Sequence, residues 1–248
     1  MHKVKLTIPI FIPEQLYRIL RSLKPKKVTT CDEKSLAQNL LGDRDIEWSW
    51  IASKIPPGEG EVLDFGNGGS LLGLIAAQQG HNVLAIDLCS VKWLYEHPRL
   101  HFKQGDLLKL ALPEKNYDYV INCSTVEHVG LVGRYGVYED SPDGDLAAMK
   151  RLMRLMKPGG YMLLTIPIGK DAVFKPMTRI YGVERLPVLL DGYEIQQEEY
   201  WVKDNQNRWI LEEKDRVLNI EASVMSWDFK CNIYSLGCFV LRRPVARE

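Results

Sequence analysis

Residues 62–70 read Val62-Leu63-Asp64-Phe65-Gly66-Asn67-Gly68-Gly69-Ser70, a short apolar strand that runs directly into a glycine-rich turn. Glycines at the carboxyl end of a strand let the backbone turn tightly and approach a ligand closely. The start of the following helix offers unpaired N–H groups and a positive dipole end, which suit a carboxylate or a phosphate. Asp64 would either accept a hydrogen bond from a ligand amine or hold the loop. A glycine-rich turn can also serve only as a turn, so the neighbouring signals decide.

Strands and helices alternate on both sides of this turn. We expect strands at 61–65, 81–86, 100–103, 117–122 and 161–166, and helices at 43–54, 71–79 and 146–156. The turn Lys157-Pro158-Gly159-Gly160 is expected to end the last of these helices. This alternation predicts βαβ crossovers and a parallel sheet with helices on both faces, an α/β fold.

The two ends of the chain have different patterns. Near the N-terminus, Leu16, Ile19, Leu20 and Leu23 recur at helical spacing and Pro25 stops the run, which predicts an arm with a short helix. In the last third we expect strands at 193–200, 208–212 and 237–242 and a short helix near 188–190. Strands without long helices between them predict a β-rich C-terminal edge.

Acidic residues follow three of the predicted strands. Asp87 ends the second strand, 87 − 64 = 23 residues after Asp64, where an acid grips a ribose diol in Rossmann-type sites. Gly105-Asp106-Leu107 follows the third strand, where a carboxylate would accept a hydrogen bond from an adenine amine. The fourth strand runs into Cys123-Ser124-Thr125-Val126-Glu127-His128. Four ordered features on successive strand ends favour a binding site over chance.

Residues 62–166 resemble the class I S-adenosylmethionine-dependent methyltransferases. Asp64, Gly66 and Gly68 match the first motif of that family, whose loop wraps the methionine part of the cofactor. Asp87 matches its ribose-binding acid and Asp106 its adenine-contacting acid. The resemblance implies S-adenosyl-L-methionine as cofactor and S-adenosyl-L-homocysteine as product. It implies the following cofactor-binding residues: Asp64, Gly66, Asn67, Gly68, Asp87, Leu88, Asp106, Leu107, Asn122 and Ser124.

The resemblance also implies an overall architecture. This is a Rossmann-like, doubly wound, mostly parallel seven-stranded sheet with helices on both faces and an antiparallel C-terminal edge. Residues 1–45 would form an N-terminal arm or helical lid, and residues 46–248 the methyltransferase domain, with acceptor-side insertions at 170–235. One departure is that Ser70 stands where the first motif normally has its third glycine. A nicotinamide-dependent enzyme is disfavoured because Glu127-His128 and the turn at 157–160 would have no role in it.

A narrower resemblance concerns residues 127–145. Glu127-His128-Val129-Gly130-Leu131, Gly133-Arg134-Tyr135-Gly136 and Asp143-Gly144-Asp145 are similar to a little-characterised methyltransferase-like family whose members lie among glycan-biosynthesis genes. Val132 interrupts a run that is contiguous in that family. The similarity implies a sugar, glycan or glycolipid precursor as the methyl acceptor.

Candidate catalytic residues follow the fourth strand. His128 is expected to be the general base that takes the acceptor's proton, with Glu127 orienting it, because imidazole titrates near neutrality. Alternatively, His128 caps a turn or stacks over the cofactor. Arg134 and Tyr135 are expected to contact the acceptor. Aromatic residues flank the acceptor side: Trp48, Trp50, Tyr181, Trp201 and Trp209. Oxygen is the favoured acceptor atom, since no Asn-Pro-Pro-Tyr sequence follows the fourth strand.

Composition excludes several other classes. The 32 basic residues balance 32 acidic ones, which disfavours nucleic acid as a partner. The five scattered cysteines form no CxxC pair, so a zinc knuckle or dithiol motif is not expected. No metal is predicted, although Glu127 with Asp140, Asp143 or Asp145 would suit a hard cation. No apolar run approaches the ~20 residues that span a bilayer, which favours a cytoplasmic protein without stable membrane insertion. A homodimer is left open.

These observations predict an O-methyltransferase that acts on a small-molecule or glycan acceptor. The alternatives are a quinone or phenol O-methyltransferase and a non-catalytic S-adenosylmethionine-binding protein.

Overall fold

A computed structural model of the chain describes residues 43–204, 208–223 and 234–245. The N-terminal helix expected near Leu16–Leu23, and nearly all of the expected arm or lid at 1–45, lie outside the described residues. Cys31 and Cys231 lie outside them as well.

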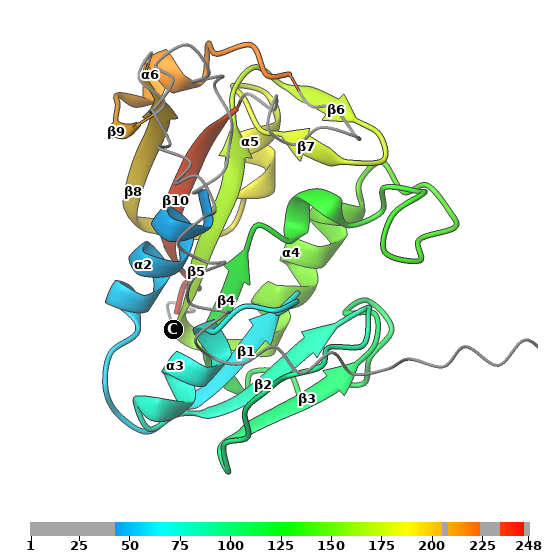
Figure 1. Cartoon of the computed structure of the whole chain (residues 1–248), viewed down its shortest axis with the longest axis vertical. Coiled ribbons are helices and arrows are strands. Elements are labelled where there is room, and N and C mark those ends of the chain that lie inside the picture. Colours follow the sequence, from blue (N-terminus) through cyan, green and yellow to red (C-terminus); the bar gives the residue numbers. More distant parts are fainter. Residues whose placement is uncertain (1–42, 205–207, 224–233, 246–248) are drawn as a thin grey trace, which may run out of the picture. The chain divides into compact units, whose positions relative to one another are not determined.

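One sheet of eight strands organises the described chain (Figure 1). Its order is β3-β2-β1-β4-β5-β10-β8-β9. The strands are β1 (Glu61–Phe65), β2 (Asn82–Asp87), β3 (Leu100–Gln104), β4 (Tyr117–Cys123), β5 (Met156–Ile168), β8 (Glu194–Lys203), β9 (Trp209–Leu211) and β10 (Ser235–Arg242). Neighbours from β3 to β5 pair in parallel, whereas β10 is antiparallel to both β5 and β8. The predicted mostly parallel sheet with an antiparallel C-terminal edge is confirmed.

The predicted number of seven strands is wrong. The strand expected at 193–200 extends to Lys203, and its last three residues, Trp201 to Lys203, pair with Leu211, Ile210 and Trp209. This pairing places β9, which lies within the strand predicted at 208–212, at the edge of the sheet, so the sheet has eight strands. A separate two-stranded sheet, which the sequence did not suggest, consists of β6 (Ala172–Phe174) and β7 (Thr178–Ile180).

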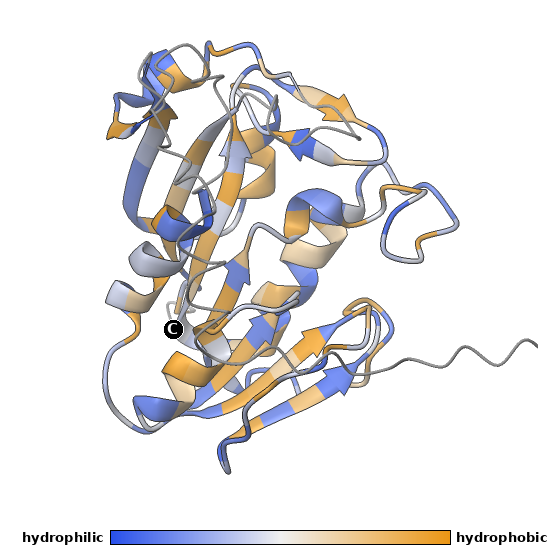
Figure 2. Cartoon of the chain, in the orientation of Figure 1, coloured by the Kyte–Doolittle hydropathy of each residue, from blue (hydrophilic) through white to orange (hydrophobic). Residues whose placement is uncertain are grey.

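Helices cover both faces of the sheet. On one face, α2 (Asp43–Lys54) and α3 (Leu72–Gln78) bury Ile51 and Leu72 against Val62 and Val83 of the strands. On the other face, α4 (Gly144–Leu155) buries Leu152 in a second core cluster. Apolar residues accordingly run along the central strands (Figure 2). Two shorter helices, α5 (Arg185–Leu189) and α6 (Lys214–Val217), and the 3-10 helix η2 (Val126–His128) complete the described elements.

The expected turn at 157–160 is instead part of β5. The helix α4 ends at Leu155 and the strand starts at Met156, which pairs with Tyr117. The pairing of β5 with β4 shifts register between Tyr117 and Tyr119, opposite the glycines of this segment, where Gly159 has φ 80. Arg243 donates hydrogen bonds to the carbonyls of Met153, Arg154 and Met156. These bonds satisfy the free carbonyls at the end of α4, a role that a separate turn would otherwise have.

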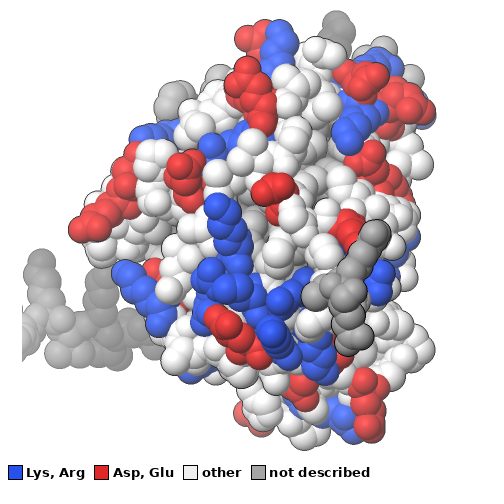
Figure 3. All heavy atoms as spheres, turned by 180° about the vertical axis from the view of Figure 1, so that it is seen from behind, with Lys and Arg blue, Asp and Glu red and all other residues white. Residues whose placement is uncertain are grey.

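The surface behind the sheet carries mixed charge. Lys and Arg side chains gather along the outer side of α4, with Asp and Glu among them (Figure 3). Glu114 lies within 3.0 Å of Arg151 and 3.7 Å of Arg154, and Lys157 lies 2.8 Å from Asp118. Arg151, Arg154 and Lys157 on this face therefore have local acidic partners. Among the helices of the described ranges, none is long and apolar enough to cross a bilayer.

Candidate functional site

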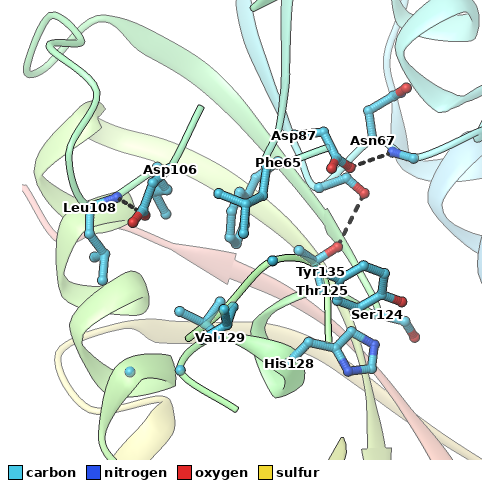
Figure 4. Close-up of a pocket in the computed structure, with 18 of the residues that line it drawn as sticks. Phe65, Asn67, Asp87, Asp106, Leu108, Ser124, Thr125, His128, Val129 and Tyr135 are labelled. Carbon is cyan, nitrogen blue, oxygen red and sulfur yellow. Dashed lines mark hydrogen bonds between the residues drawn. The ribbon is translucent and has the colours of Figure 1, made fainter. Parts of the chain in front are cut away.

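A pocket of about 980 Å³ opens at the carboxyl ends of the parallel strands β1 to β4. It is lined by residues 44, 48, 65–70, 87–88, 105–109, 123–125, 128–130, 135–141 and 144. Ligands in open α/β sheets bind at this edge, where neighbouring crossovers leave in opposite directions. Figure 4 shows the side chains that face the pocket from these loops.

The glycine-rich turn lies against the loop that follows β4. Gly66 and Gly68 have φ 70 and 53, a region that favours glycine. A Cβ added at Gly66 would lie 2.0 Å from Cγ2 of Thr125, and the Thr125 hydroxyl donates to the Gly66 carbonyl over 3.3 Å. A Cβ added at Gly69 would meet nothing within 4 Å, so this edge of the pocket is open to the approach of a ligand.

Side chains behind the turn fix its path. Asp64 is buried, accepts a hydrogen bond from Asn67 Nδ2 over 2.5 Å and does not line the pocket. Burial raises its pKa to about 7. Asn67 Oδ1 accepts a bond from Trp93, and the Ser70 carbonyl accepts one from Tyr95. Ser70, which replaces the third glycine, closes the turn by donating its N–H to the Asn67 carbonyl over 2.9 Å.

The two predicted cofactor acids both face the pocket (Figure 4). Asp87 accepts a hydrogen bond from the Gly68 N–H over 2.9 Å and one from the Cys89 N–H over 2.8 Å. Asp106 accepts a bond from the Leu108 N–H over 2.9 Å. Asp87 thus joins the end of β2 to the glycine turn on β1. Leu88 and Leu107 line the pocket beside the two acids.

Two predicted cofactor residues lie at the carboxyl end of β4, with Asn122 inside the strand and Ser124 just after it. Asn122 is fully buried and its amide faces Met149 Sδ at 3.8 Å, away from the lining residues. Ser124 lines the pocket with φ 44, a conformation rare for a residue other than glycine. Tyr135 has φ 55 and also lines the pocket. Strained backbone of this kind is concentrated at functional sites.

His128 lines the pocket from η2 and is held by the carbonyl of Met177, which lies 2.7 Å from Nδ1. Its ring is tilted against that of Tyr135, with centroids 5.5 Å apart. Burial, followed by the nearby Arg134 guanidinium, lowers the pKa of His128 to about 3. The imidazole is therefore neutral over the physiological range.

Glu127 lies behind His128 and is buried. Its Oε1 is 3.7 Å from His128 Nε2, which is longer than a hydrogen bond, and its Oε2 has no hydrogen-bond partner. Burial raises the pKa of Glu127 to about 8, so the carboxyl group is largely protonated at neutral pH. In the structure the Met177 carbonyl, rather than Glu127, contacts the histidine at hydrogen-bond distance.

The expected acceptor residues adjoin His128. The Arg134 guanidinium lies 4.4 Å from the centre of the Tyr135 ring and donates to the Met177 carbonyl over 3.3 Å. Tyr135 lines the pocket, whereas Arg134 does not. Of the five aromatic residues expected on the acceptor side, Trp48 alone lines the described pocket.

The carboxylates that would suit a cation have other partners. Asp140 pairs with Lys175, Asp143 with Arg185, and Asp145 with Arg185 and Tyr181. Over the residues that the structure describes, no group of three His, Cys, Asp or Glu side chains could hold a metal ion.

Sequence reasoning missed a buried arginine on β7. Arg179 Nη1 donates to the carbonyls of Glu127 and Val129, and its Nη2 donates to those of Ser141 and Pro142. One guanidinium thus holds both ends of the pocket-lining loop 129–142. No periodicity or motif marks this residue in the sequence. Arg44 and Glu47 on α2 were also missed, because an Arg and a Glu three residues apart on a helix resemble an ordinary surface pair.

Solved structures share this fold. A 1,6-didemethyltoxoflavin-N1-methyltransferase from Burkholderia thailandensis, solved with S-adenosylhomocysteine, is similar with a TM-score of 0.50 and 16% identity, over 96% of this chain and 93% of that one. The [4+2]-cyclase SpnF is similar with a TM-score of 0.57 and 16% identity, over 82% of this chain and 81% of that one. These likenesses establish an α/β methyltransferase fold.

Two sequence comparisons add to this. A protein of Mycolicibacterium smegmatis named as a probable S-adenosylmethionine-dependent methyltransferase is 24% identical over 148 residues, which are 55% of this chain and 52% of that protein. The chain thus spans about half the length of this curated relative. Residues 100–223 match the family model described as "Caenorhabditis protein of unknown function, DUF268". Since that match covers half of its residues, the chain belongs to the DUF268 family.

Proposed function

We propose that this protein is an S-adenosylmethionine-dependent methyltransferase whose acceptor is a hydroxyl group of a sugar, glycan or glycolipid precursor. The observation that carries the proposal is the position of Asp87, which ends β2 and accepts a hydrogen bond from Gly68 at the mouth of the pocket. A carboxylate at this place suits the two hydroxyls of a ribose. Similarity to the probable methyltransferase of Mycolicibacterium smegmatis supports the same cofactor.

The residues present fit an adenosyl cofactor. Asp87 would bind the ribose and Asp106 the adenine amine, while the open edge at Gly69 leaves room for a ligand against the backbone. Small-molecule sites usually enclose about 300–1,000 Å³. A pocket of about 980 Å³ stands at the upper end of that range, which suits a cofactor and a small acceptor together.

When bound, the cofactor supplies a methyl group activated on a sulfonium. The protein's task is then to align the acceptor and to take its proton. Because His128 Nδ1 faces the Met177 carbonyl, the proton of the neutral imidazole sits on Nδ1 and the lone pair on Nε2. Nε2 accepts a hydrogen bond from the acceptor hydroxyl.

The low pKa of His128 sets the order of events. A base this weak does not deprotonate a free hydroxyl group to a significant extent. A hydroxyl oxygen that gains a methyl group becomes positively charged and strongly acidic, and then even a weak base takes its proton. His128 therefore accepts the proton during or after methyl transfer, while orienting the hydroxyl before it.

Aromatic side chains on opposite elements support a ring-shaped acceptor. Trp48 lines the pocket from α2 and Tyr135 lines it from the loop after η2. The Tyr135 ring contacts both the Arg134 guanidinium and the His128 ring, which limits its movement. Aromatic faces provide large contact areas for the apolar faces of sugar rings.

Isothermal titration with S-adenosylmethionine, S-adenosylhomocysteine and NAD tests the cofactor. We expect the two adenosyl compounds to bind and NAD not to bind. The Asp87→Asn variant is expected to bind the adenosyl compounds about 10- to 100-fold more weakly, as for the loss of a charge-assisted hydrogen bond. The exposed acid Asp191 lies away from the pocket, so Asp191→Asn is the matched control.

Methyl transfer to a panel of acceptors tests the reaction. The panel contains nucleotide sugars, free glycans and phenols, and transfer is followed with cofactor labelled in the methyl group. Product from a sugar supports the proposal, and product from a phenol alone would replace the acceptor class. The same fold occurs in a [4+2]-cyclase, so the fold alone does not require methyl transfer. Cofactor binding without transfer to any acceptor would contradict the proposed methyltransferase activity but not the proposed cofactor site.

A further inference from the structure

A basic side chain enters the pocket from α2, outside the sequence motifs of the strand ends. Arg44 lines the pocket, one helical turn before Trp48. It forms an ion pair with Glu47 through Nη1. About half of the Arg44 side chain (48%) is exposed, whereas the Glu47 side chain is fully buried. The guanidinium is therefore fixed on one side and open on the other.

Glu47 anchors this guanidinium to the sheet. Its Oε1 accepts hydrogen bonds from the Ser124 hydroxyl, at the end of β4, and from the Thr165 hydroxyl on β5 over 3.0 Å. A buried carboxylate with these partners has little freedom to move. Burial lowers the pKa of Arg44 and the Glu47 carboxylate raises it, with the net result well above its ordinary value, so Arg44 keeps its charge.

Arg44 lies near the start of the glycine turn. Its partner Glu47 is bonded to Ser124, and the next residue, Thr125, contacts Gly66. This places the guanidinium where the turn faces the first residues after β4. Asp87 and Asp106, by contrast, lie at the ends of β2 and β3, on the other side of β1.

The other basic residues of the pocket lining are poorer anion sites. Across the part of the lining that the structure describes, the basic side chains are Arg44, Lys109 and His128. The Lys109 side chain is 84% exposed and lies 3.6 Å from Asp106. His128 is neutral. Arg44 is thus the described lining residue that combines a fixed position with a positive charge.

We infer that Arg44 binds a ligand carboxylate, that of the amino-acid end of the adenosyl cofactor, and that Glu47 is the positioning residue that holds Arg44 ready for it. This inference rests on the proposed function. The cofactor carries an adenosine end, which matches the acids on β2 and β3, and a carboxylate end, which needs a cation. A planar guanidinium offers paired N–H donors to a carboxylate.

The test compares two ligands in isothermal titration. S-adenosylhomocysteine carries the amino-acid end, and 5′-methylthioadenosine has the same adenosine without it. We expect Arg44→Gln to weaken binding of S-adenosylhomocysteine about 10- to 100-fold and to leave methylthioadenosine affinity unchanged. Glu47→Gln should give a smaller loss, again for S-adenosylhomocysteine alone. Arg154→Gln, on the exposed side of α4, is the control that changes neither affinity.

Each other outcome contradicts the inference in a different way. An equal loss of affinity for both ligands would mean that Arg44 only supports the fold. The melting temperatures of Arg44→Gln and of the charge-conserving variant Arg44→Lys check this reading. Unchanged affinity of Arg44→Gln for S-adenosylhomocysteine overturns the assignment. If this variant then has a raised KM for an anionic acceptor, Arg44 binds the acceptor instead of the cofactor. If the unsubstituted protein binds neither ligand, the proposed function fails together with the inference.

Discussion

The carbonyl oxygen of Met177 lies 2.7 Å from His128 Nδ1, although the two residues are 49 positions apart in the chain. Met177 immediately precedes β7, whose Arg179 holds the backbone on either side of the same histidine. The small β6–β7 sheet therefore determines which nitrogen of His128 carries its proton.

The first prediction concerns the charge of His128. Because burial lowers its pKa to about 3, the ring should stay neutral, with the proton on Nδ1, from pH 5 to pH 8. The nitrogen chemical shifts of the His128 imidazole should therefore be constant over this range. A midpoint for His128 near 6.5 would contradict the buried environment described here.

Replacing His128 tests its role in transfer. His128→Ala is expected to lower turnover by about 100-fold or more, the usual contribution of a positioned proton acceptor, while S-adenosylhomocysteine still binds. His101→Ala, on β3 and exposed, is the control and should be fully active. Full activity of His128→Ala would remove this residue from the proton path.

Glu127 should make stability depend on pH. Its carboxyl group ionises near 4.5 in the unfolded chain and near 8 in the folded one, so the folded state holds more protons between these values. The free energy of unfolding should therefore fall as pH rises from about 4.5 to 8. Glu127→Gln cannot ionise and lacks this loss. Its free energy of unfolding, relative to that of the unsubstituted protein, should therefore rise by a few kcal/mol from pH 5 to pH 8.5, since each pH unit is worth about 1.4 kcal/mol.

Urea denaturation at several pH values measures this difference. Asp64, with a raised pKa of about 7, contributes in the same direction but is present in both proteins and cancels. Parallel stability curves for the two proteins would show that Glu127 is ionised in the fold.

Two glycines of one turn should respond differently to alanine. Gly66→Ala is expected to destabilise the protein, because its Cβ would overlap Thr125 and its φ is 70. Gly69→Ala meets no atom within 4 Å and should leave the melting temperature unchanged. Since Gly69 lines the pocket, its new methyl group should weaken S-adenosylhomocysteine binding. Titration and thermal melting separate the effects, and unchanged affinity in Gly69→Ala would place the ligand elsewhere.

Arg179→Met should cost about 3–5 kcal/mol of stability, because buried carbonyls lose a charged donor and Asp145 loses a positive neighbour at 3.7 Å. Hydrogen exchange should increase mainly over residues 127–142. Lys175→Met, which removes an exposed ion pair with Asp140 on the same loop, should cost less than about 1 kcal/mol. Similar losses in both variants would mean that Arg179 is not the main support of the loop.

The sequence predicted most of the elements because their signals are local. The strand Glu61–Phe65 and the helix Asp43–Lys54 were predicted at their observed bounds, since a break at Pro56-Pro57-Gly58 separates them. The positions of Asp87 and Asp106 at strand ends followed in the same way. All eight strands of the sheet, including β9 at the range predicted as 208–212, overlap ranges that the sequence predicts as strands. Only the total of seven, which the family resemblance implied, is wrong, because the pairing of β9 with β8 depends on tertiary register.

Side-chain contacts across the sequence were harder to predict. The Glu127–His128 pair suggested an orienting carboxylate, yet the contact at Nδ1 comes from a backbone carbonyl, a group that every residue carries and no motif marks. The role of Arg179 could not be predicted from the sequence for a related reason. Its four acceptors are all carbonyls, and they lie on two segments that the sequence separates by about a dozen residues.

Arg179 also bears on how this pocket can diverge among relatives. Because it binds backbone carbonyls on both ends of the loop 129–142, the link between these ends does not depend on the side chains in between. The residues from Val132 to Asp140 can therefore change in identity or number while the base of the loop, and His128 beside it, keep their places. Since this loop carries Tyr135, a proposed acceptor contact, transplanting it between homologues would test whether it sets acceptor preference while the strand ends that carry Asp87 and Asp106 stay unchanged.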